Sequence, residues 1–100
     1  MKDLHFSRTE YVTLETSYGM LHQPRQEAEV HYTIGVDENN IPYWFEIYCP
    51  KLDWSDEGQL SVRYDAKTKK LYLVDYDGVF TLPEPIIEKL QDEFGIINNL

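Results

Sequence analysis

The sequence has a single cysteine, Cys49, so no disulfide bond can form within the chain. Small domains outside the cell usually carry several disulfides, because a short chain buries little apolar surface. No apolar run approaches the ~20 residues that a transmembrane helix needs, and none follows Lys2 as in a signal peptide. We therefore expect one cytoplasmic domain over residues 1–100.

Basic residues are scarce. Nine Lys and Arg stand against 18 Asp and Glu, which gives a net charge of −9, and residues 26–50 and 71–88 contain no base at all. Nucleic acid and anionic lipid repel such a chain, so we expect no direct nucleic-acid partner and no membrane partner. A partner selected by charge should be a basic protein, although acidity can also serve solubility alone.

Alternating apolar and polar residues predict a β-hairpin with strands at 28–36 and 41–49 and a polar loop at 37–40. The aliphatic residues and Cys49 share one face, which we expect to be the core. Pairing Val36 with Ile41 sets the expected register of the other face. In that register His31 faces Glu46, Thr33 faces Trp44, and Glu29 faces Tyr48.

A second meander is expected over residues 60–82, with Asp65 paired to Lys70 and a two-residue turn at Asp77-Gly78 that pairs Tyr76 with Val79. Residues 11–18 suggest a further strand, and residues 50–59 suggest a long acidic loop.

A short C-terminal helix begins near Pro85 and stops at Gly95, and Ile87, Leu90 and Phe94 form its apolar stripe. The expected fold is α+β, an antiparallel meander sheet of five or six strands with this helix packed on one face.

Residues 71–79 resemble the nucleophile motif of haloacid-dehalogenase-type phosphatases, an apolar strand followed by Asp-x-Asp-Gly. The resemblance implies that Asp75 attacks phosphorus and that Asp77 handles the leaving oxygen. That family continues with helices, a lysine and magnesium-binding acids, for which residues 79–100 are too few. A hairpin turn at Asp77-Gly78 accounts for the same residues without an enzyme.

Metal and catalytic sites are not indicated. Cys49, His5, His22 and His31 show no metal-ligand spacing. His31 beside Glu46 could orient a general base, but no nucleophile or oxyanion site accompanies the pair. We expect no enzyme, no cofactor and no metal.

Two acidic surfaces that carry aromatic residues are the candidate protein-binding sites. The first is the polar face of the hairpin, formed by Glu29, His31, Trp44, Glu46 and Tyr48. The second is the loop with Asp53, Trp54, Asp56 and Glu57. If other elements pack on these residues, the aromatic rings belong to the core instead.

These features favour a small inhibitor that occupies a basic surface of a partner, such as a nuclease or nucleoprotein effector, where nucleic acid normally binds. In charge and size alone, the chain is similar to phage anti-CRISPR proteins, which act in the host cytoplasm. It is similar in the same way to immunity proteins that neutralise nuclease toxins. The alternatives are a non-catalytic subunit of a larger assembly and, less in keeping with the residues, a small enzyme.

Overall fold

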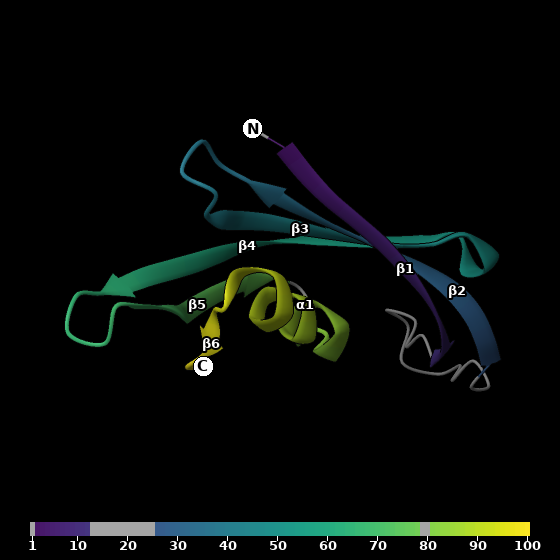
Figure 1. Cartoon of the computed structure of the whole chain (residues 1–100). Helices are drawn as coiled ribbons and strands as arrows, with labels where there is room; N and C mark the ends of the chain where they lie inside the picture. Colours follow the sequence, from purple (N-terminus) through teal and green to yellow (C-terminus); the bar gives the residue numbers. More distant parts are fainter. Residues whose placement is uncertain (1, 13–25, 79–80) are drawn as a thin grey trace.

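The computed structural model describes residues 2–12, 26–78 and 81–100, which form a six-stranded sheet and one α-helix (Figure 1). The elements are β1 (Lys2–Val12), β2 (Gln26–Val36), β3 (Pro42–Cys49), the 3-10 turn η1 (Pro50–Leu52), β4 (Trp54–Asp65), β5 (Lys70–Gly78), α1 (Glu84–Phe94) and β6 (Ile97–Asn98). The strands lie side by side in chain order, antiparallel from β1 to β5, and β6 pairs parallel to β5. The expected α+β fold is confirmed.

The β2–β3 hairpin has the expected faces but not the expected register. Thr33 lies opposite Glu46 rather than Trp44, and His31 lies opposite Tyr48 rather than Glu46. The slip is two positions along β3. Because side chains alternate with period two, an even slip leaves every residue on its expected face.

The turn and a bulge cause this slip. The backbone N–H of Asp37 donates to the carbonyl of Ile41, and Asn40 takes a left-handed φ of 63°, so the loop is longer than the four polar residues. The Asp37 carboxylate also accepts backbone N–H bonds from Asn39 and Ile41. This register places a bulge at Tyr43 of β3, because Val36 pairs with Pro42 and Gly35 pairs with Trp44.

Strands β4 and β5 pair Asp65 with Lys70, as expected. The turn expected at Asp77-Gly78 is wrong, because both residues extend β5 and lie opposite Gln59 and Gly58 of β4. The expected partner of Tyr76, Val79, lies outside the described residues.

The acidic loop expected at residues 50–59 is also wrong. It is η1 followed by the first half of β4, which gives β5 a longer strand to pair with. Of the strand expected over residues 11–18, residues 13–18 lie outside the described part of the chain. Residues 11–12 are the end of β1, which pairs with β2 along its whole length from Lys2.

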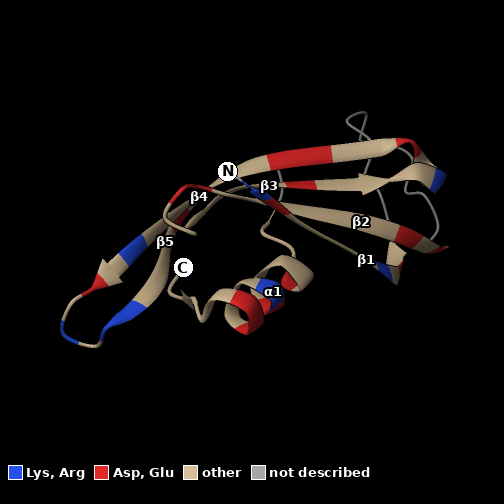
Figure 2. Ribbon diagram, turned by 45° about the horizontal axis from the view of Figure 1, so that its top comes forward, with Lys and Arg blue, Asp and Glu red and all other residues tan. Residues whose placement is uncertain are grey.

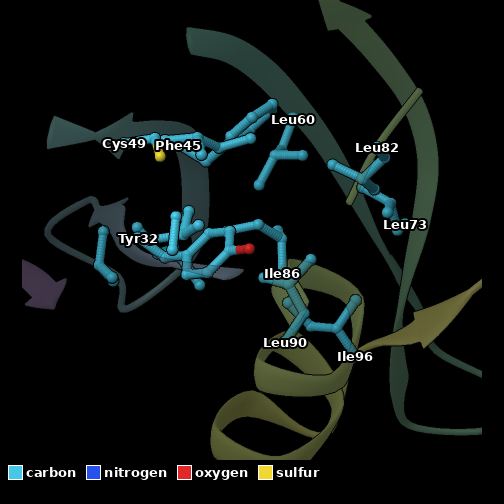
Figure 3. Packing of buried hydrophobic residues seen from close by; sticks show 14 residues of the cluster. Tyr32, Phe45, Cys49, Leu60, Leu73, Leu82, Ile86, Leu90 and Ile96 are labelled. Carbon is cyan, nitrogen blue, oxygen red and sulfur yellow. The ribbon is translucent and has the colours of Figure 1, made fainter. Parts of the chain in front are cut away.

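Helix α1 lies against one face of the strongly curved sheet (Figure 1), which we call the inner face. Its two fully buried residues, Ile86 and Leu90, point toward Leu60, Leu73 and Leu82 (Figure 3). Of the expected stripe, Ile87 and Phe94 are only partly buried, because the helix turns Ile86 rather than Ile87 to the centre of the core. Strands β2 and β3 contribute the largest share of the core: Ala28, Val30, Tyr32, Ile34, Val36, Phe45, Ile47 and Cys49.

The helix ends as the sequence predicts. Gly95 takes a left-handed φ of 66°, and the N–H of Ile96 donates to the carbonyl of Leu90. This reversal returns Ile96 to the core, where it is 2% exposed, and leads the chain into β6.

Candidate protein-binding face

The outer face of the sheet is the face opposite α1, and alternate residues of β1 to β4 supply its side chains. Directly paired residues of antiparallel strands point to the same side, so the registers set rows of side chains across this face. One row is His5, Thr33, Glu46 and Glu57. The next row is Ser7, His31, Tyr48 and Ser55. We call six outer-face residues the acidic face: Glu29, His31, Trp44, Glu46, Tyr48 and Glu57.

Glu46 and Glu57 lie directly opposite each other on β3 and β4. Two carboxylates in this position repel each other, because side chains of paired residues approach within ~5.5 Å at Cβ. They border an open hollow of about 480 Å³, which Tyr48, Ser55 and Asp56 also line, and Tyr48 is 42% exposed. The hollow therefore combines two negative charges with an accessible aromatic ring.

His31 lies next to the carboxylate pair but does not face Glu46, so the predicted His31–Glu46 pair is wrong. Its Nε2 is 3.9 Å from Oε1 of Glu29, and its ring stacks on that of His5 at a centroid distance of 5.7 Å. The sequence did not indicate His5, because β1 was not expected there. His5 in turn contacts the Thr33 hydroxyl, with 3.0 Å between Nδ1 and Oγ1.

Trp44 lies over Gly35, its partner in β2, at the end of the acidic face. A Cβ at Gly35 would come within 2.9 Å of the indole, so the glycine leaves the space that the ring occupies. Trp44 is half-buried by this contact and leaves the rest of its surface accessible. Trp44 lies on the expected outer face, but it is partly buried, and Lys2 and Asp3 line the hollow beside it.

The second candidate surface does not exist as one unit. Trp54 pairs with Cys49 and Asp56 pairs with Ile47, so both side chains point to the inner face, and Trp54 packs against the core. Asp53 is exposed in the turn before β4, with a left-handed φ of 46°.

Only Glu57 of the expected loop joins the acidic face.

On the inner side of the sheet, Tyr76 has a pKa above its ordinary value. Burial of its side chain raises the pKa most, and the charges of Asp56 and Asp77 raise it further.

Charge is unevenly distributed over the molecule. Among the described residues, no Lys or Arg points to the outer face from β1, β2, β3 or residues 55–61 of β4. Four bases gather instead toward the tip of the β4–β5 hairpin, shown in blue in Figure 2: Arg63, Lys67, Lys69 and Lys70. The red segments of β3 and of the first half of β4 in the same view lie away from that tip.

Within the described ranges, no group of three or more His, Cys, Asp and Glu side chains could hold a metal ion. No helix in those ranges is long and apolar enough to span a membrane. No protein-family model, no curated protein and no solved structure matches this chain. The acidic face is thus the strongest candidate site, and its chemistry is that of a surface for cations.

Proposed function

We propose that the protein is an inhibitor that covers a basic surface of a partner protein with its acidic face, and that this partner surface normally holds nucleic acid. The observation that carries the proposal is the Glu46–Glu57 pair, on a part of the outer face to which no Lys or Arg of the described β1, β2 and β3 points. The repulsion between the two carboxylates costs stability in the free protein. A lysine or arginine of a partner placed between them would remove that cost on binding.

An arginine fits this hollow in both charge and shape. Its planar guanidinium can donate to two carboxylates and can stack on an aromatic ring, here Tyr48. Glu29 adds a further carboxylate one strand away. Several carboxylates spaced across neighbouring strands offer a basic cleft a pattern of negative charge that resembles a phosphate backbone.

Trp44 is the proposed hydrophobic anchor of the complex. Large aromatic side chains that become fully buried contribute most to the lifetime of an interface, whereas exposed charges mainly speed association. Trp44 already rests on Gly35, so little conformational freedom would be lost when a partner covers it.

The test is affinity capture from the native host and against a panel of purified nucleases and nucleoprotein effectors. Wild type is compared with Glu46→Lys/Glu57→Lys and with a control of equal charge change, Glu84→Lys/Asp92→Lys on α1. We expect wild type and control to retain the same basic partner and the acidic-face variant to lose it. Equal retention by all three proteins would refute the proposal.

A competition experiment tests the nucleic-acid part of the proposal. Nucleic acid that the captured partner binds should be displaced by wild type at stoichiometric concentration, and not by Glu46→Lys/Glu57→Lys. Simultaneous binding of both ligands would show that the acidic face contacts another basic surface.

A further inference from the structure

Strand β1 is an edge strand. It pairs with β2 on one side, and on its other side the backbone of residues 2–10 has no partner in the part of the chain that the structure describes. Its pairing with β2 runs without a bulge from Lys2 to Val12, and it contains no Pro or Gly. Proteins usually protect such an edge with prolines, bulges, a short strand or a covering element, because free backbone groups recruit another strand.

Helix α1 does not cover this edge. It contacts β1 through Arg8, whose Nη1 donates to Glu88 at 2.7 Å, and through Lys89, whose Nζ lies 5.0 Å from the centroid of the Phe6 ring. Phe6 and Arg8 are even-numbered residues of β1, which point to the inner face. In the described part of the chain, no other strand pairs with this backbone edge of β1 (Figure 1).

We propose that two copies of the protein pair antiparallel through β1, about a two-fold axis at Phe6, to form one continuous sheet. A two-fold axis perpendicular to the sheet keeps each face continuous, so inner residues meet inner residues. With the axis at Phe6, Lys2 lies opposite the partner's Glu10, Leu4 opposite the partner's Arg8, and Phe6 opposite the partner's Phe6. On the outer face, His5 then lies opposite the partner's Ser7.

The other registers bring poor neighbours together. An axis at His5 sets Lys2 opposite the partner's Arg8, and an axis at Arg8 sets this arginine opposite itself. An axis at Ser7 sets Leu4 opposite the partner's Glu10. Like charges in paired positions are unfavourable, and the axis at Ser7 pairs no opposite charges. Only the Phe6 axis forms two oppositely charged pairs and an aromatic pair.

Salt should strengthen this dimer. Each copy carries a net charge of −9, so the copies repel each other until salt screens the charges. The two exposed ion pairs contribute little in comparison. This dependence is opposite to that of the proposed inhibitory complex, and the two interfaces are therefore distinguishable by salt alone.

The first test is sedimentation equilibrium of the full chain at low and high salt. We expect a monomer–dimer equilibrium that shifts to dimer as salt rises. A monomer at every concentration up to millimolar, at both salt levels, would overturn the proposal.

Cysteine pairing tests the register. His5 and Ser7 are exposed outer-face residues, whereas the native Cys49 is 1% exposed. Under mild oxidation, a mixture of a His5→Cys chain and a Ser7→Cys chain should form the mixed disulfide dimer in clear excess over both homodimers. A mixture of His5→Cys with Ser55→Cys, an outer-face residue on β4, is the matched control and should form none. Predominance of either homodimer, or equal cross-linking with the control, would contradict the Phe6 axis.

Discussion

Tyr32 joins β1 to the core of the sheet. Its hydroxyl donates to Oε2 of Glu10 at 2.8 Å, and its ring stacks on Phe6 at a centroid distance of 5.0 Å. Burial, followed by the hydrogen bond and the charge of Glu10, raises the pKa of Tyr32 above its ordinary value. The folded protein therefore holds the neutral phenol in a range of pH where an unfolded tyrosine ionises.

This shift predicts a loss of stability at alkaline pH. The contribution of Tyr32 is fully present below the unfolded tyrosine pKa of ~10 and declines as pH rises above it. Tyr32→Phe should lower the free energy of unfolding by about 1 kcal/mol at neutral pH, because one hydrogen bond is lost. It should also flatten the decline above pH ~10, with Tyr76 responsible for what remains. Urea unfolding measured across this range checks both effects, and parallel declines in the two proteins would contradict the assignment.

Cys49 gives a second prediction at the residue scale. Its side chain is 1% exposed on the inner face, so a thiol reagent should modify it slowly in the folded protein and rapidly in denaturant. With a reagent that releases a coloured thiolate when it modifies a cysteine, absorbance measures the rate of both reactions. Equal rates in the two conditions would mean that β3 exposes its inner face.

At the scale of elements, repulsion between Glu46 and Glu57 should lower the stability of the β3–β4 pair. Glu57→Gln should raise the free energy of unfolding by a few tenths of a kcal/mol, the scale of single cross-strand pairs. Glu38→Gln, in the exposed loop before β3, removes the same charge without a paired carboxylate and is the control. Thermal unfolding of both variants checks the prediction. A Glu57→Gln protein no more stable than the control would show that the repulsion is negligible.

Alternation in the sequence predicted which face each residue of β2 and β3 occupies, because the apolar residues of an alternating strand lie on the buried face. It did not predict the register, which depends on the left-handed Asn40 and on the bulge at Tyr43. These are features of backbone geometry that hydrophobic alternation does not report. The members of the acidic face on β2 and β3 were therefore anticipated, whereas Glu57 was expected in a loop and the cross-strand pairs were not predicted.

The missed strands have a different cause. The inner residues of β1 include Arg8 and Glu10, which interact with Glu88 and Tyr32 rather than with apolar neighbours, so the strand lacks an apolar stripe. In β4, Asp56 and Gly58 interrupt the inward alternation that begins at Trp54. Trp54 nevertheless begins β4, because the inner side of this strand also accommodates an acidic residue and a glycine.

At the scale of the whole molecule, acidic and basic side chains lie in separate regions. The acidic face occupies β2, β3 and β4, and the bases gather near the β4–β5 tip, in a molecule 48 Å long (Figure 2). Approach to a basic partner should therefore be oriented, with the acidic face leading. Charge reversal at the acidic face should slow association, whereas Trp44→Ala should mainly speed dissociation.

The most direct test of the proposed function is the association rate constant with the captured partner, measured by stopped flow as salt rises. For wild type and for Glu84→Lys/Asp92→Lys, we predict fast association that slows steeply with salt, since exposed charges are screened over ~8 Å at physiological ionic strength. For Glu46→Lys/Glu57→Lys, we predict association at least about tenfold slower at low salt and nearly independent of salt. Equal rate constants for the three proteins, or a wild-type rate indifferent to salt, would contradict the account.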